Sequence, residues 1–383
     1  MEIGTLVSAD SHLVEPPDIF ETRLDASMRP RAPRMELTID ANGRGQHVWT
    51  LDGHMLTPLG GGAPRRGARD RENRELRALW SELDPAAYEP DAYVVALAVD
   101  GVAAAVVQPT AGLVWWRLPD SALLDALFRA QNDHMIEFCS RHPDQLNGVA
   151  CLNVDDVAAS CHELRRCREL GLVGALIPVH PGAAPPYRDP CYDPLWATAQ
   201  ELAVPLCLHL ATVRASASGP TNSIASTTAL SPAARSVNDY WVRLSLAEII
   251  FGGVFDRFPQ LRVGSVEHEI AWIPHWLRNM DFIYERRQFL TGGWRSASGQ
   301  RPSELFRSNM FATFIEDDLG VELRAHIGID NILWGNDFPH TESSWPNSRA
   351  IVGDMMRGVP GSDARAMTNS NTARLFGIEV APS

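Results

Sequence analysis

Hydrophobic positions along the chain fall into short runs separated by longer amphipathic stretches. The short runs predict strands at 3–9, 102–109, 147–153, 173–179, 204–210, 261–268, 309–314 and 331–336. The amphipathic stretches predict helices at 121–142, 155–171, 192–203, 238–259, 270–289 and 318–328. Eight strands with helices between them predict a (β/α)8 TIM-like barrel, and an open doubly wound sheet is the alternative. The first strand is not followed by a GxGxxG motif, which disfavours that alternative.

Two segments interrupt this alternation of strands and helices. We expect both to belong to a single barrel domain spanning 1–383. The segment at about 35–90 contains alternating residues around Asn42-Gly43, which predicts an inserted hairpin. It could cap the barrel mouth, contact a second subunit, or both. The segment 212–236 is rich in Ser, Thr, Ala and Gly, and its length is typical of a lid or substrate loop.

The amino-acid composition disfavours or excludes several classes of function. The formal charge of −13 disfavours nucleic-acid binding, and no apolar run is long enough to span a membrane. The six cysteines contain no CxxC pair, and the first residues do not resemble a secretory signal, so we expect a cytoplasmic protein with reduced thiols. All 34 basic residues are Arg, which excludes a Schiff-base lysine, a P-loop lysine and a metal-bridging carbamylated lysine.

Polar residues gather where the predicted strands end. Asp10 and His12 follow the first strand, His209 ends the fifth, Glu267 and His268 end the sixth, and Asp337 and His340 follow the eighth. Each alone has an ordinary explanation as a turn residue or a packed histidine. Together they match a barrel mouth, where the carboxyl ends of the strands converge. Two His and two Asp also suit a first-row divalent metal such as Zn²⁺ or Mn²⁺.

The order of these motifs resembles the amidohydrolase superfamily, specifically the aminocarboxymuconate-semialdehyde decarboxylase-like branch of amidohydrolase family 2. The matching stretches are SADSHLVEPPDIF, HPDQLNGVACLN, DPLWATAQELAVPLCLHL, FGGVFDRFPQLRVGSVEHEIAWIPHWLRNMD and LWGNDFPHTESSWPN. The resemblance implies a barrel with one divalent metal, Zn²⁺ or alternatively Mn²⁺, held by Asp10, His12, His209 and Asp337. It also implies that His268 is catalytic beside the metal. Many superfamily hydrolases begin with His-x-His, and Asp10 departs from that pattern.

Three functions follow from these residues. The first is non-oxidative decarboxylation of a small aromatic or enoic acid, in which Asp337 or His268 moves a proton onto the carbon that loses CO₂. The second is hydrolysis of an amide, lactone or other ester by a metal-bound hydroxide, with Asp337 as general base and His268 beside the oxyanion. The third is a non-catalytic small-molecule binding protein, which the complete residue set disfavours. We also expect a homo-oligomer, most simply a dimer.

The sequence does not decide the roles of two further pairs of residues. Arg188 and Arg214 follow strands four and five and could bind a substrate carboxylate, although solvated surface arginines are the commoner case. Trp115 and Trp116 could line an aromatic pocket or a subunit interface.

Overall fold

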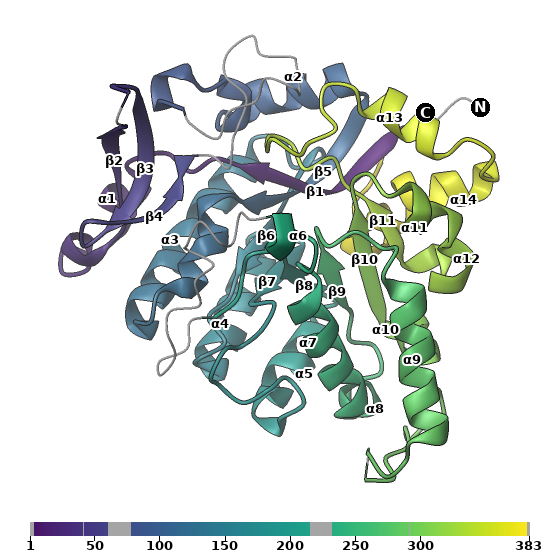
Figure 1. Ribbon diagram of the computed structural model, residues 1–383. Coiled ribbons are helices and arrows are strands. Elements are labelled where there is room, and N and C mark those ends of the chain that lie inside the picture. Colours follow the sequence, from purple (N-terminus) through teal and green to yellow (C-terminus); the bar gives the residue numbers. More distant parts are fainter. Residues whose placement is uncertain (1–3, 41, 60–77, 215–231, 291, 381–383) are drawn as a thin grey trace.

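The computed structural model describes residues 4–40, 42–59, 78–214, 232–290 and 292–380 (Figure 1). Its main feature is an eight-stranded parallel sheet in the order β1-β5-β6-β7-β8-β9-β10-β11. The strands are β1 (Leu6–Leu13), β5 (Val102–Pro109), β6 (Leu146–Cys151), β7 (Gly174–Ile177), β8 (Leu206–His209), β9 (Val263–Val266), β10 (Met310–Phe314) and β11 (Ile332–Trp334). Chain order equals sheet order, as in a TIM barrel, so the predicted fold class is confirmed.

Helices surround the strands on the outside of the sheet, as Figure 1 shows. Each predicted helix exists, but the stretch 238–259 is broken at Gly252-Gly253 and the stretch 318–328 is two short helices. The helices are α1 (Ile19–Arg23), α2 (Pro90–Asp100), α3 (Ser121–Ser140), α4 (Val157–Glu169), α5 (Asp193–Glu201), α6 (Pro232–Arg235), α7 (Tyr240–Phe251), α8 (Val254–Arg257), α9 (Ile273–Arg286), α10 (Pro302–Asn309), α11 (Asp318–Glu322), α12 (Arg324–Ile327), α13 (Ser348–Met355), α14 (Gly361–Arg365) and α15 (Asn371–Phe376).

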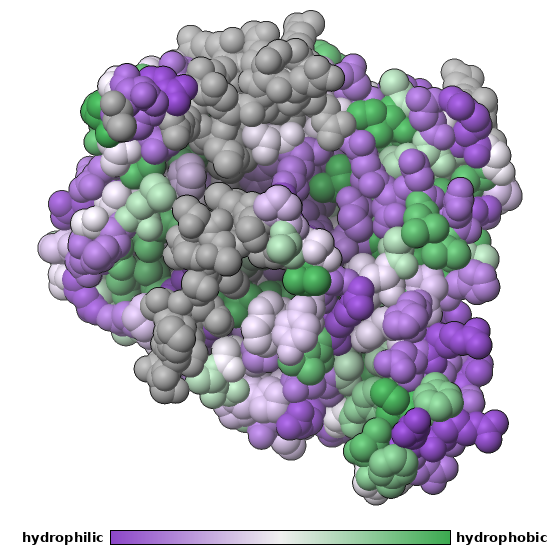
Figure 2. All heavy atoms as spheres, viewed as in Figure 1, coloured by the Kyte–Doolittle hydropathy of each residue, from purple (hydrophilic) through white to green (hydrophobic). Residues whose placement is uncertain are grey.

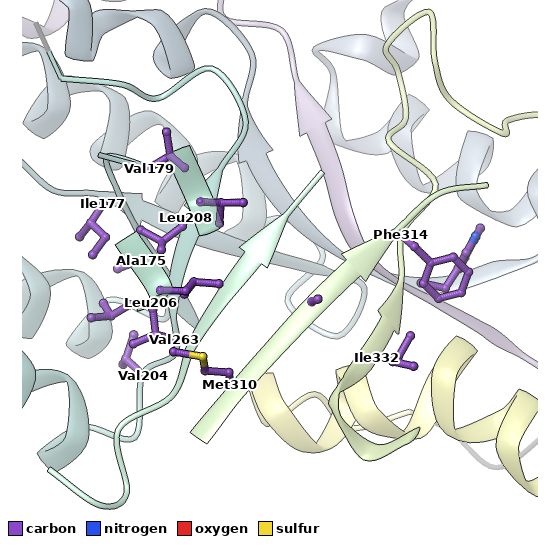
Figure 3. Close-up of a cluster of buried hydrophobic side chains, with 14 of the residues drawn as sticks. Ala175, Ile177, Val179, Val204, Leu206, Leu208, Val263, Met310, Phe314 and Ile332 are labelled. Carbon is purple, nitrogen blue, oxygen red and sulfur yellow. The ribbon is translucent and has the colours of Figure 1, made fainter. Parts of the chain in front are cut away.

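Side chains alternate across the sheet, and this alternation decides which residues can reach the mouth. On β8, Leu206 and Leu208 pack toward the helices, in the cluster drawn in Figure 3, whereas Cys207 belongs to the second core cluster with Val266 of β9. Because alternate residues of a strand share a face, His209 lies on the side of Cys207, away from the helices. The alternation therefore directs a histidine at the end of β8 into the barrel.

Polar contacts close the barrel between its first and last strands. The backbone N–H of Asp337 donates to the carbonyl of Asp10 at 2.8 Å. The amide oxygen of Asn336 accepts hydrogen bonds from the hydroxyls of Ser8 and Ser11 at 3.1 and 2.7 Å. Its amide nitrogen donates to the buried carboxylate of Asp100 at 3.3 Å. Asn336 thus joins two strands that lie far apart in the sequence.

The insertion contains a separate antiparallel sheet of β2 (Arg34–Ile39), β3 (Gly45–Leu51) and β4 (His54–Pro58). The hairpin predicted around Asn42-Gly43 is confirmed, because β2 and β3 pair across that turn. Residues 60–77 of the insertion and 215–231 of the expected lid lie outside the described residues. Within the described part of the chain, no helix combines the length and hydrophobicity that a membrane span requires.

Candidate metal centre

The four residues expected to hold a metal all lie at the carboxyl ends of barrel strands. Asp10 and His12 lie within β1, which extends farther than the predicted strand 3–9, and His209 ends β8. Asp337 follows β11. All four side chains are fully buried. Figure 2 shows a recess near the middle of this face, close to the position of α6 in Figure 1.

Distances between the side-chain atoms show how the group is arranged. Nε2 of His12 is 3.3 Å from Oδ1 of Asp10 and 3.3 Å from Oδ1 of Asp337. Nε2 of His209 is 3.5 Å from Oδ1 of Asp10. The structure therefore brings Asp10, His12 and His209 together and places Asp337 beside His12.

Both imidazoles are oriented by backbone carbonyls. Nδ1 of His12 is 2.7 Å from the carbonyl of Pro109, and Nδ1 of His209 is 2.8 Å from the carbonyl of Leu210. A carbonyl only accepts, so each Nδ1 carries the hydrogen and each Nε2 presents a lone pair to the carboxylates. Such tethering is usual for metal-binding histidines.

Several buried atoms of this group have no hydrogen-bond partner among the described residues. They include Nε2 of His12, Nε2 of His209, Oδ2 of Asp10 and Oδ2 of Asp337. Buried polar atoms are rarely left without a partner, and acceptors that face one another require a cation or a proton between them. The donor set and its orphaned atoms fit a divalent metal.

Charges within the group shift its pKa values strongly. Burial alone raises the pKa of Asp10, but the charge of His209 and hydrogen bonds from His12 and His209 outweigh burial and hold it well below its usual range. Burial lowers the pKa of His209, and Asp10 reverses this effect and raises it to about 9. Without a metal, a proton on His209 therefore occupies the space between these acceptors.

The other titratable groups at the mouth are shifted mainly by burial. Burial, together with the neighbouring charge of Asp10, raises the pKa of Asp337 to about 7. Burial and the charge of His209 lower the pKa of His268 to about 3, so its imidazole is neutral at pH 7. Nδ1 of His268 lies 3.1 Å from the Ser265 hydroxyl, and its Nε2 has no partner among the described residues.

Three residues that the sequence analysis did not assign to the site also belong to it. The amide of Gln108, at the end of β5, donates to Oδ1 of Asp10 at 2.7 Å. Nδ1 of His340 lies 2.8 Å from Oδ1 of Asp337. Oε2 of Glu267 lies 3.5 Å from Nε2 of His209. Glu267 and His340 were among the polar residues at the predicted strand ends but were not assigned a role, and Gln108 lies inside the predicted strand 102–109.

The two pairs of residues whose roles the sequence left undecided, Arg188 with Arg214 and Trp115 with Trp116, have structural roles. Arg214 is buried, and its guanidinium bonds the Asp155 carboxylate and the carbonyl of Trp116, so the expectation of a solvated arginine is wrong for it. Arg188 is exposed and pairs with Glu248. Trp115 and Trp116 are fully buried in the second core cluster, which excludes both an interface and a pocket lining.

A family model described as Amidohydrolase matches residues 46–378. The chain belongs to the amidohydrolase family. This confirms the family expected from the sequence, and it confirms an enzyme family rather than a non-catalytic binding scaffold.

The chain is also similar to individual proteins in sequence and in fold. A γ-resorcylate decarboxylase from Rhizobium sp. (strain MTP-10005) is 27% identical over 290 residues, which cover 69% of this chain and 80% of the relative. The crystal structure of an amidohydrolase from Mycobacterium avium subsp. paratuberculosis K-10 matches with a TM-score of 0.77 and 22% identity, covering 97% of this chain and 99% of that one.

A third match is the structure of a dihydroxybenzoic acid decarboxylase from Polaromonas sp. JS666, solved with bound manganese and the inhibitor 2-nitroresorcinol. Its TM-score is 0.66 at 18% identity, and the match covers 99% of this chain and 98% of that one. The structural matches support the barrel fold. The Rhizobium and Polaromonas proteins are decarboxylases, which is the reaction class that the sequence analysis placed first.

Proposed function

We propose that this protein is a metal-dependent decarboxylase of a small aromatic acid. The observation that carries the proposal is the buried set of Asp10, His12 and His209 with Asp337 beside it, in which Nε2 of each histidine lies close to a carboxylate oxygen and has no hydrogen-bond partner among the described residues. A divalent cation would provide these nitrogen and oxygen atoms with a common partner. The relatives named as decarboxylases of hydroxylated benzoates supply the reaction class.

We assign Asp10, His12, His209 and Asp337 as the residues that hold the metal, and Mn²⁺ or Zn²⁺ as the ion. When bound, the metal would act as a Lewis acid on oxygens of the substrate. Two carboxylates and two imidazoles suit either ion. The manganese in the Polaromonas structure supports Mn²⁺.

Asp337 is placed to handle the proton that the reaction requires. Oδ1 of Asp337 is engaged by His340, while its Oδ2 is buried without a partner. We propose that this carboxyl carries the proton, and its burial favours the protonated form because burial raises the pKa of Asp337 in the metal-free site. The proton moves to the substrate carbon, the bond from that carbon to the carboxylate breaks, and the electron pair of that bond returns to the ring as CO₂ leaves.

His268 has a different task, because its pKa is lowered and its ring stays neutral. Ser265 fixes the ring through Nδ1, so the unpartnered Nε2 faces the barrel interior with a fixed orientation. We propose that His268 orients the substrate through a hydrogen bond at Nε2 while Asp337 supplies the proton.

Hydrolysis of an amide, lactone or ester is the second candidate. The unpartnered Oδ2 of Asp337 favours it, because the ionised carboxylate could instead accept a proton from water. A substrate panel separates the two reactions. Metal-reconstituted protein is incubated in D₂O with 2,6-dihydroxybenzoate and, separately, with amides and lactones.

We expect CO₂ release and one deuterium at the carbon that lost the carboxylate, with the amides and lactones intact. Hydrolysis of an amide or lactone without CO₂ release from any carboxylated phenol or enoate would contradict decarboxylation and support the second candidate.

Assembly and location are part of the proposal. We infer a homodimer, which sedimentation would detect as twice the chain mass of 42.2 kDa. We also infer a cytoplasmic location, which the six cysteines without disulfides support.

A further inference from the structure

The turn after β9 places a carboxylate where a glycine would be the easier residue. Glu267 has φ of +64°, in the left-handed region that non-glycine residues seldom adopt. Glu267 is one of a few residues in the described chain with such a backbone, and Asp337 is another. Strained backbone of this kind is concentrated at functional sites, where surrounding contacts hold it in place.

Surrounding contacts do hold this turn. The backbone N–H of Glu267 donates to the Thr313 hydroxyl at 3.0 Å. The indole N–H of Trp272 donates to the carbonyls of His268 and Glu269, both at 3.0 Å. These contacts fix the backbone on both sides of Glu267 and leave its side chain directed toward β8.

The carboxylate of Glu267 ends beside the metal-binding histidines. Oε2 lies 3.5 Å from Nε2 of His209. Nδ1 of His209 is taken by the Leu210 carbonyl, so in the neutral ring Nε2 and Oε2 are both acceptors. A mainly buried carboxylate that faces this nitrogen needs either a proton or a metal cation between them.

Glu267 belongs to the larger of the two donor groups at the mouth. One ligand atom from each of Asp10, His12, His209 and Glu267 lies within 4.8 Å of all the others. Asp337 forms a separate group with His12 and His340. The donor set therefore contains a carboxylate that the proposed ligands above do not include.

We propose that Glu267 is a further carboxylate ligand of the divalent metal. This inference rests on the proposed metal site and adds a fifth ligand to it. An additional hard oxygen donor makes the set richer in oxygen, which favours Mn²⁺ relative to Zn²⁺.

Glu269 provides a matched control in the same turn. It is an acidic residue with φ of +54°, but its carboxylate accepts hydrogen bonds from the backbone N–H groups of Ile315 and Glu316 at 3.1 and 3.3 Å. Its oxygens are therefore already used. Glu269→Gln removes the same charge two residues away without removing a candidate ligand.

The experiment measures dissociation constants of Mn²⁺ and Zn²⁺ for metal-free wild type, Glu267→Gln and Glu269→Gln by calorimetry, with chelator competition where binding is tight. We expect Glu267→Gln to weaken Mn²⁺ at least about tenfold and Zn²⁺ clearly less, while Glu269→Gln stays within about threefold of wild type for both. Equal Mn²⁺ affinity in Glu267→Gln and wild type would overturn the inference. An equal loss for both metals would show an electrostatic effect only and would also overturn it.

A second variant covers the case in which Glu267→Gln does not fold. Glu267→Gly relieves the left-handed backbone, so metal-free Glu267→Gly should unfold at a higher temperature than metal-free wild type while binding Mn²⁺ more weakly. Unchanged Mn²⁺ binding in this variant would overturn the inference. If wild type bound neither metal, the proposed metal site itself would fail, whereas normal wild-type binding with unaffected Glu267 variants would remove only the role of Glu267.

Discussion

At the scale of single residues, the mouth of the barrel is built from side chains in unfavourable surroundings. Asp337 and Glu267 both have left-handed backbones, which cost about 1–2 kcal/mol each for a residue with a side chain. His12 and His209 present unpartnered nitrogen atoms to carboxylates in a buried space. These costs are concentrated in one group of residues, which is typical of a site selected for chemistry rather than for stability.

Replacing His268 should separate catalysis from metal binding. His268→Asn removes the imidazole but not Asp10, His12 or His209, so metal content should stay at the wild-type value. We expect kcat for CO₂ release to fall about 10²- to 10⁴-fold, the usual contribution of a positioned acid–base group. Elemental mass spectrometry and a CO₂ assay on the same sample check both numbers. Loss of the metal along with the activity would show that His268 is a ligand instead.

Gly335 tests how closely the last strand must approach the first. A Cβ at this position would lie 2.6 Å from Cβ of Asp10 and 2.9 Å from its backbone nitrogen, so Gly335→Ala must displace Asp10. We expect Gly335→Ala to lose about 1–3 kcal/mol of unfolding free energy and to bind metal more weakly. Gly4→Ala has open space around its Cβ and serves as the control. Denaturant unfolding and metal titration of both variants measure the difference, and identical behaviour of the two would contradict this packing.

At the scale of elements, the hydrophobic pattern was sufficient to predict the barrel strands and most helices. The run that contains His209 predicted β8 and placed that histidine at the end of the strand. The direction of its side chain follows from the alternation along β8 in the structure. The stretch 238–259 was predicted as one helix, but Gly253 adopts φ of +67° and ends it early. The spacing of hydrophobic residues does not predict which backbone angle a glycine adopts.

The side-chain partners at the site were harder to predict than the elements. Gln108 was part of a predicted strand, but its hydrogen bond to Asp10 depends on the bulge and register between β1 and β5. His340 contacts Asp337 because of the turn that follows β11. The burial of Arg214 was not predicted, because the sequence does not show that its guanidinium lies against Asp155 and the carbonyl of Trp116. Register and loop geometry decide these contacts, and neither is encoded in a local pattern.

Helix α3 contains a histidine whose burial should make stability depend on pH. Burial, and then the charge of Arg23, lower the pKa of His134 to about 4, against 6.5 when unfolded. A lowered histidine pKa means that the unfolded chain binds the proton more strongly, so stability falls as the pH drops from about 6.5 to about 4. The contribution is up to about 3 kcal/mol. His134→Gln should show a smaller loss of unfolding free energy between pH 7 and pH 4.

His142→Gln, at a more exposed ion pair with Asp91, is the control for that measurement. Denaturant unfolding of wild type and both variants at several pH values compares them directly. The same acid sensitivity in His134→Gln and wild type would contradict the burial of a neutral histidine in α3.

At the scale of the whole molecule, the site exists only when the barrel is closed. Asp10 and Asp337 come from opposite ends of the sequence, and Asn336 joins their strands through Ser8 and Ser11. The metal donors therefore converge in the folded chain and disperse in the unfolded one. Because a ligand that binds only the folded state stabilises it, we expect metal binding at this site to stabilise the folded chain.

The central claim is that one divalent metal at the strand ends makes this chain a decarboxylase. The most direct test adds Mn²⁺ in fractions of an equivalent to metal-free protein and records the rate of CO₂ release from 2,6-dihydroxybenzoate and related hydroxylated aromatic acids. The account predicts a rate that rises linearly and stops rising at one Mn²⁺ per chain, with no comparable rise in His209→Ala. Full metal occupancy without CO₂ release from any of these acids, or the same rate in metal-free protein, would contradict it.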